Sequence, residues 1–319
     1  MTRYVIRRLL WGLLMLVIVA ALTFILFRVI PTGNPAVLRA GRDPQPKLIH
    51  EIEHVLGLDK SLPTQFWDFL KGVFLHFEFG YSYYNQESVI DLIRERLPAT
   101  ISLTIGAVVL WIFLGMGIGI LSALRRHSAT DRASMGGALI LVSAPEFWLG
   151  LLLLLLFSSD VGKFKIFPGA GSYVGITSDP WKWFTSLLMP WFVLAAGSAA
   201  VFARLIRGNL LEVMDEDYIR TARAKGLPEK QVVKQGVRAS VNPVVTLMGL
   251  EMGLLLGGAV IIETVFNIPG VGLLAYHSIV NADFAVIEGT VLLAAMFIII
   301  ANIVVDIVYA YLDPRVRYS

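Results

Sequence analysis

Six long apolar segments, nearly free of charge, place the strongest constraint on what this chain can fold into. They occupy residues 9–27, 99–124, 135–159, 184–203, 244–266 and 289–312. Within them only Glu146, Glu251, Glu263 and Asp306 are charged. A helix needs about 20 apolar residues to cross the hydrocarbon core of a bilayer, and each segment is long enough. The sequence therefore predicts an all-α membrane protein with six transmembrane helices in one transmembrane domain over residues 1–319.

The distribution of basic residues predicts the orientation of these helices. The segments that would face the cytoplasm hold 16 of the 27 Lys and Arg and occupy 1–8, 125–134, 204–243 and 313–319. The opposite segments, 28–98, 160–183 and 267–288, are longer in total but hold only 11. This positive-inside bias predicts that both termini are cytoplasmic and that the protein lies in the cytoplasmic (inner) membrane. The net charge of +3 is then a topology signal, and we expect membrane lipid but no nucleic acid as a partner.

Two absences narrow the chemistry. The chain has no cysteine, which excludes disulfides, thiolate metal sites and cysteine nucleophiles. It also lacks the G-x-x-x-x-G-K-[ST] pattern that cradles nucleotide phosphates in P-loop proteins. We therefore expect no cofactor on this chain and no ATPase activity of its own. If ATP drives the protein, ATP and Mg must bind to a separate subunit.

Segment 28–98 is predicted to be an extracytoplasmic loop with short amphipathic helices. Apolar residues share one face from Leu48 to Leu56, and Gly57 would end that helix. Similar stretches run over 64–77 and 88–97. We expect these helices to lie on the outer membrane surface or to cap the helix bundle.

The same loop contains a match to the zinc motif H-E-x-x-H between His50 and His54. On a helix the two histidines point the same way and could bind zinc, which makes a membrane metalloprotease one alternative. The third ligand position of the extended motif is Lys60, and a protonated lysine cannot ligate a metal. We therefore favour an amphipathic helix with solvated histidines and expect no metal site.

Segment 204–243 is predicted to be a cytoplasmic helix–turn–helix. Three acidic residues open the first helix and three basic residues close it: Asp215, Glu216, Asp217, Arg220, Arg223 and Lys225. This order suits the helix dipole, and Gly226 followed by Pro228 marks the end. A second helix can begin at Pro228 and must end before residues 242–243, which are Asn-Pro. One interpretation is a basic helix on lipid headgroups, but its mixed charge favours docking of a cytoplasmic partner.

The acidic residues in the membrane segments are the candidates for a translocation path. Glu251 is the deepest, and we weigh a water-filled path against an interhelical hydrogen bond. Gly249, Gly253 and Gly257 form a stripe on another side of that helix, which predicts close packing against a second helix. Glu263 and Asp306 lie near segment ends, where hydration or pairing is expected. Glu146 follows Pro145, where a broken helix could expose it to protein or water.

Several stretches resemble one family. DYIRTARAKGL at 217–227 resembles the EAA loop of ABC importer permeases, in the form found in the oligopeptide/dipeptide/nickel subfamily. Ala222 and Gly226 fit the general pattern, whereas Arg220 and Thr221 replace its first two residues. Residues 4–10, 57–60, 263–272 and 312–318 are also similar to that subfamily. The large loop after the first span resembles the first permease of the pair.

This resemblance implies a type I ABC importer fold and a set of partners. The partners are a second homologous permease, two ABC ATPase subunits and an extracytoplasmic solute-binding protein. The ATPase-coupling residues would be Asp217, Tyr218, Arg220, Thr221, Ala222, Arg223, Ala224, Lys225 and Gly226. Di- or oligopeptides are the implied substrate, with nickel chelates or oligosaccharides as alternatives. A stand-alone ion-driven carrier or channel is the competing class, but it usually relies on inverted repeats and intramembrane charges, and no repeat is visible.

Overall fold

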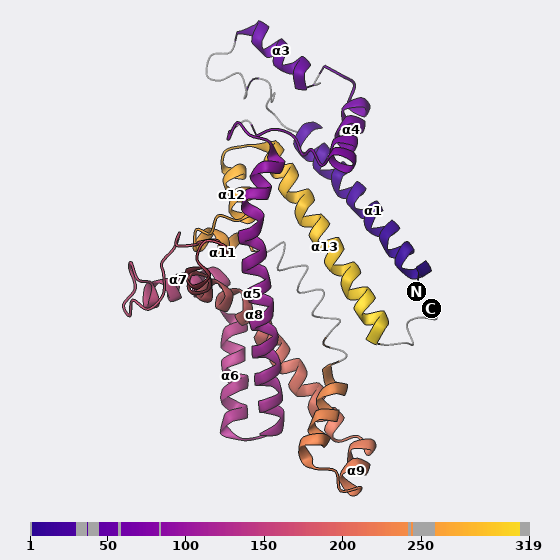
Figure 1. Cartoon of the computed structure of the whole chain (residues 1–319), viewed down its shortest axis with the longest axis vertical. Coiled ribbons are helices and arrows are strands. Elements are labelled where there is room, and N and C mark those ends of the chain that lie inside the picture. The colour runs from indigo at the N-terminus through magenta and orange to yellow at the C-terminus, as the bar shows by residue number, and fades with distance from the viewer. Residues whose placement is uncertain are drawn as a thin grey trace.

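The molecule is elongated and built from helices (Figure 1). The computed structural model describes residues 2–29, 37, 45–56, 59–82, 84–241, 244 and 259–312. In that part of the chain there is no strand, only two isolated bridges at Tyr81–Ser88 and Ser158–Phe167. Helices α3 (Pro46–Leu56) and α4 (Leu62–Lys71) lie at one end, and α9 (Asp217–Ala224) lies at the other (Figure 1).

Four of the predicted segments form helices that could cross a membrane. They are α1 (Thr2–Phe24) with the π-helical turn η1 (Ile25–Val29), α5 (Val89–Leu124), α8 (Pro180–Met214) and α13 (Phe284–Leu312). Each extends beyond its apolar window. The 36 residues of α5 span about 54 Å at 1.5 Å per residue, more than the roughly 30 Å of a hydrocarbon core. The short helix expected at 88–97 is consequently not separate, because it is the first part of α5.

The third apolar window is not one straight helix. It divides into α6 (Ala129–Ser143) and α7 (Glu146–Phe157), whose axes differ by 107°. Ala144 is extended and Pro145 caps α7, because a residue before proline is driven out of the helical region. The break falls at Pro145, the position where the sequence suggests a broken helix before Glu146. Counting the bent pair as one span gives five candidate spans in the described part of the chain.

Most of the fifth window, 244–266, lies beyond the described ranges. So do Glu251, Gly249, Gly253 and Gly257, whose predicted roles remain predictions. The end of that window forms α11 (Val260–Val265), which a short loop joins to α12 (Val271–Val280).

The main core lies between α5 and α8. Trp111 of α5 is fully buried and meets Phe202 of α8 edge to face, with ring centroids 4.5 Å apart. About two turns further along α5, a Cβ on Gly119 would lie 2.7 Å from the carbonyl oxygen of Ala203. Small residues at such a seam let two helix backbones approach closely, which is the usual way membrane helices pack.

Of the amphipathic stretches in the loop after α1, the one over 64–77 packs onto the bundle. The predicted helix over 48–56 is α3, and the stretch 64–77 corresponds to α4 with the π-helical turn η2 (Gly72–His76). Phe66 of α4 contacts the ring of Phe24 at 5.2 Å between centroids. Nearby, Arg28 forms an ion pair of 3.1 Å with Glu288 of α13, which is almost completely buried. These contacts fasten the loop to α1 and α13.

Candidate functional site

Helix α9 protrudes beyond α8 at the end of the molecule opposite α3 and α4 (Figure 1). Asp217 lies in its first turn and Arg223 in its last, so both charges complement the helix dipole. A second helical segment follows over residues 229–241. The predicted helix–turn–helix within 204–243 is thus confirmed.

One face of α9 is buried in a small apolar cluster. Ile219 and Ala222 pack against Val232 of the following helix, with Leu227 at the edge. The opposite face is exposed and consists of Asp217, Tyr218, Arg220, Thr221, Ala224 and Lys225. Ala222, one of the two residues that match the family pattern, therefore holds the motif together from inside and offers no surface to a partner.

The end of α9 is a complete Schellman turn. Leu227 N–H donates to the carbonyl of Ala222 at 3.3 Å, and Gly226 N–H donates to that of Arg223 at 2.9 Å. Gly226 has a φ of +74°, in the left-handed region that costs any residue with a Cβ. Leu227 then folds back onto the apolar cluster. The glycine predicted to stop the helix is required by its backbone conformation.

An ion pair fixes the second helix to the first. Arg223 donates to Glu229 at 2.9 Å and 3.3 Å through two guanidinium nitrogens. This hydrogen bond lowers the pKa of the Glu229 carboxyl below its usual 4.5 and raises the pKa of Arg223. Further along, a Cβ on Gly236 would lie 2.8 Å from the sulfur of Met214, so the second helix packs closely against the end of α8.

Sequence reasoning missed a second polar cluster at this end, centred on Asp131 of α6. Arg207 of α8 donates to its two carboxylate oxygens at 2.7 Å and 2.9 Å. Ser122 of α5 donates to the same carboxylate, and so does the backbone N–H of His127. Asp131 is 4% exposed and joins α5, α6 and α8. The signal was present as a capping pattern, because Ser128 caps α6 and accepts a bond from Asp131 N–H.

Glu263 of α11 belongs to an internal network. Its carboxylate accepts hydrogen bonds from Thr100 Oγ1 at 2.6 Å and from Leu273 N–H at 2.8 Å, and Thr100 Oγ1 accepts from Val271 N–H. These bonds satisfy the first turn of α12, whose amides have no partner within the helix. The hydration or pairing expected at a segment end is thus internal pairing, since Glu263 has no exposed surface.

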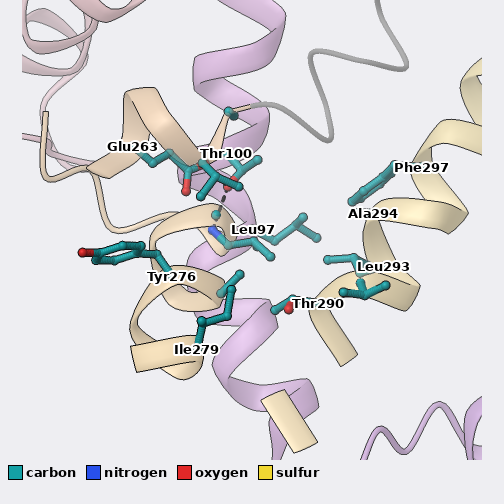
Figure 2. A pocket seen from close by; sticks show the side chains of 15 residues that line it. Leu97, Thr100, Glu263, Tyr276, Ile279, Thr290, Leu293, Ala294 and Phe297 are labelled. Atoms are coloured by element: carbon teal, nitrogen blue, oxygen red, sulfur yellow. Dashed lines mark hydrogen bonds between the residues drawn. The ribbon is translucent and has the colours of Figure 1, made fainter. Parts of the chain in front are cut away.

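A cavity of about 280 Å³ lies beside this network, between α5, α11, α12 and α13. Figure 2 shows Glu263 and Thr100 at one side, facing Thr290, Leu293 and Phe297 of α13. The other lining residues are mostly apolar. Because the carboxylate already accepts hydrogen bonds from the protein, this cavity suits apolar groups better than charged ones.

The two remaining acids of the membrane segments take no part in a cavity described here. Glu146 is the first residue of α7 and is exposed at the helix N-terminus. Asp306 lies in α13, and its side chain is outside the described part of the chain.

The zinc-like motif lies on α3. His50 contacts Glu53 at 3.2 Å, and His54 lies 4.0 Å from Asp59. Both imidazoles are more than four-fifths exposed. Lys60, at the third ligand position, is hydrogen-bonded to Asp68 at 2.8 Å, which raises the pKa of the lysine and keeps it protonated. No group of three metal-binding side chains occurs among the described residues.

Comparison with known proteins covers the whole chain. The family described as binding-protein-dependent transport system inner membrane component matches residues 115–318, and its N-terminal companion matches 1–104. A protein of Brucella abortus (strain 2308) named as a peptide transport system permease is 40% identical over 320 residues, covering all of both chains. Glutathione transport system permease proteins of Salmonella choleraesuis and Escherichia coli O1:K1 are likewise 40% identical over the full length of both chains.

Proposed function

Because this chain belongs to the family of inner membrane components of binding-protein-dependent transport systems, we propose that it forms half of the membrane path of an ATP-driven importer. A second homologous permease supplies the other half. Two ABC ATPase subunits, which carry ATP and Mg, bind on the cytoplasmic side. An extracytoplasmic solute-binding protein delivers the substrate. The chain itself does no covalent chemistry.

The observation that carries this proposal is the construction of α9. Its buried face and Schellman turn fix the helix to the end of α8, while its other face remains exposed. A helix held in this way can transmit a movement of its partner into α8 without melting. We assign Tyr218, Arg220, Thr221, Ala224 and Lys225 to the contact with an ATPase, and Ala222, Arg223 and Gly226 to the support of the turn.

The proposed contact between α9 and an ATPase also gives the orientation of the molecule in the membrane. The end with α9 and the turn between α5 and α6 faces the cytoplasm, and the end with α3 and α4 faces outward. Six spans and two cytoplasmic termini complete this topology. It is supported by the bias of the basic residues and by the position of α9 opposite α3 and α4 (Figure 1).

The proposed substrates are di- or oligopeptides, including peptides of the glutathione type. The support is the naming of full-length relatives as peptide and glutathione transport permeases. ATP-driven closure of the ATPases would shift the permease between two arrangements, inward-open and outward-open, because the partner binds them with different affinity.

Charge reversal at α9 tests the ATPase contact, and the chain offers a matched control. Arg220 is 68% exposed and lies 3.6 Å from Asp217, three residues earlier. Arg94 of α5 is 71% exposed and lies 3.7 Å from Asp91, also three residues earlier, at the other end of the molecule. Each variant therefore removes one exposed Arg–Asp ion pair with a spacing of three residues from its helix. We expect Arg220→Glu, but not Arg94→Glu, to lose ATPase subunits during purification in detergent.

The readout is the ratio of ATPase to permease in the purified complex, followed by ATP hydrolysis in liposomes. Equal ATPase retention together with equal binding-protein-stimulated hydrolysis in the two variants would contradict the assignment of α9. Retention of ATPase with loss of binding-protein-stimulated hydrolysis in Arg220→Glu alone would place α9 in coupling but not in assembly.

A further inference from the structure

A small polar cavity lies between the first turns of α5 and the turn that joins α12 to α13. Its volume is about 210 Å³. The polar residues that line it are Tyr84, Asn85, Arg96, His277, Ser278, Asn281 and Asp283. It shares no lining residue with the apolar cavity of Figure 2.

Asp283 is the buried anion of this cavity. Only 3% of its surface is exposed. One carboxylate oxygen accepts a hydrogen bond from Ser82, whereas the other, Oδ1, is buried without a partner among the described residues. A buried carboxylate oxygen without a donor is costly, because water has been removed and nothing replaces it.

Arg96 is the cation of the same cavity. Its Nε is also buried without a hydrogen-bond partner in the described part of the chain. Its guanidinium forms no ion pair within 4.0 Å with Asp283, although both residues line the cavity. The cavity is thus lined by two oppositely charged side chains that share no direct ion pair.

This arrangement selects the ligand by its charge. An anion alone would meet the carboxylate of Asp283, and a cation alone would meet the guanidinium of Arg96. Only a ligand with both charges gains two charge-assisted hydrogen bonds and no repulsion. The volume is below the roughly 300–1,000 Å³ of cavities for drug-sized ligands, so it admits an amino-acid-sized group but not a long peptide.

We propose that this cavity binds a small zwitterion, an amino acid or a dipeptide, with the ligand carboxylate on Arg96 and the ligand ammonium on Asp283. In the importer this site would receive substrate at the outer mouth of the path, and that role rests on the proposed function. The side chains of His277 and Asn281 lie exposed at its rim, where a ligand would enter.

The test is equilibrium binding to the complete transporter in nanodiscs, without the binding protein. The probes are alanine, alanyl-alanine, N-acetyl-alanyl-alanine and alanyl-alanine amide. We expect each blocked dipeptide to bind at least tenfold more weakly than alanyl-alanine, since each has lost one of the two charged contacts. The ratio of alanine to alanyl-alanine affinity gives the preferred spacing of the charges.

The variants assign each contact. Asp283→Asn should weaken alanyl-alanine at least tenfold but leave the N-acetyl form unchanged, because that ligand has no ammonium. Arg96→Gln should likewise weaken the binding of alanyl-alanine at least tenfold but leave the binding of the amide unchanged, because the amide has no carboxylate. Glu288→Gln is the control, since Glu288 is an equally buried carboxylate that does not line the cavity. If a variant does not assemble, the affinities of the two blocked dipeptides for the unaltered complex still test whether both charges of the ligand are needed.

Two results would overturn the site. The first is that neither alanine nor alanyl-alanine binds. The second is that both variants weaken the binding of all four probes equally, which is the result expected if Asp283 and Arg96 only support the structure. ATP hydrolysis and peptide uptake by the same preparation separate this question from the proposed function. Uptake without probe binding refutes only the site, whereas probe binding without uptake of any peptide refutes the importer function and leaves the site.

Discussion

Replacement of Gly226 separates a conformational requirement from a contact requirement at the turn that ends α9. Gly226 has a φ of +74°, and a Cβ built on it meets no atom within 4 Å. The cost of a side chain is therefore the cost of the left-handed backbone alone, about 1–2 kcal/mol for an ordinary L-residue. Asn tolerates this conformation best after glycine, and a β-branched residue tolerates it worst. We therefore expect the stability of the turn to decrease in the order Gly, Asn, Ala, Val at position 226.

The magnitude can be measured by hydrogen exchange of the segment 217–227. Among the described residues only three buried side chains form the core of this turn, namely Ile219, Ala222 and Val232, so its local stability is small. A loss of 1–2 kcal/mol should accelerate exchange by about 5–30-fold in Gly226→Ala, with a larger effect in Gly226→Val and a smaller one in Gly226→Asn. Uptake by the reconstituted complex should follow the same order.

The control is Gly208→Ala on α8, which also meets no atom within 4 Å but lies within a regular helix. It should leave exchange at 217–227 and uptake unchanged. The reasoning fails if Gly226→Asn is as damaging as Gly226→Val, because a steric clash with a partner would then outweigh backbone conformation. It also fails if Gly226→Val exchanges like the unaltered protein.

Three further perturbations have defined outcomes. Asp131→Asn should lower the free energy of unfolding by about 2–3 kcal/mol, because it leaves the partly buried guanidinium of Arg207 without its charged partner. Thermal denaturation in detergent measures this change. A change below about 0.5 kcal/mol would mean that solvent replaces the pair. Glu263→Ala should cost about 2–5 kcal/mol in the same assay, since it leaves a buried hydroxyl and a backbone N–H without an acceptor, and Glu263→Gln should cost less. Because Arg223 lowers the pKa of Glu229 below 4.5, that pair stabilises the turn above about pH 4.5 and is lost as pH falls through the lower pKa of the folded state. Exchange at 217–227, corrected for its intrinsic pH dependence, should accelerate in acid, and Arg223→Gln should abolish this acid effect.

The turn that ends α9 could be predicted from sequence because its signals are local. Acid at the start of a helix, base at its end and a following glycine concern neighbours in the chain, and the structure confirms the helix and its stop. Which face is buried is a different question. Ala222 fits the family pattern, but only the position of Val232 shows that it points inward.

Two features could not be predicted from local sequence: the direction of the helix axes around Pro145 and the contact between residues far apart in the chain. Hydropathy over 135–159 measures how apolar a segment is, not the direction of its axis, so Pro145 suggests a broken helix but not the 107° between its two halves. The pair of Asp131 and Arg207 is separated by 76 residues, and no local pattern links the two. Ser128 followed by Asp131 indicated a helix start, but not that the same carboxylate would join three helices.

Helix α5 connects the two polar networks described above. Thr100 takes part in the network of Glu263, and Ser122 in that of Asp131. The two residues are 22 positions apart with no proline between them, a separation of about 33 Å at 1.5 Å per residue. A rod of that length cannot shorten, so a tilt of about 10° around one network displaces the other by about 6 Å. A displacement of α5 at the Asp131 end must therefore tilt the helix about the Glu263 network, shift that network sideways, or break a buried hydrogen bond.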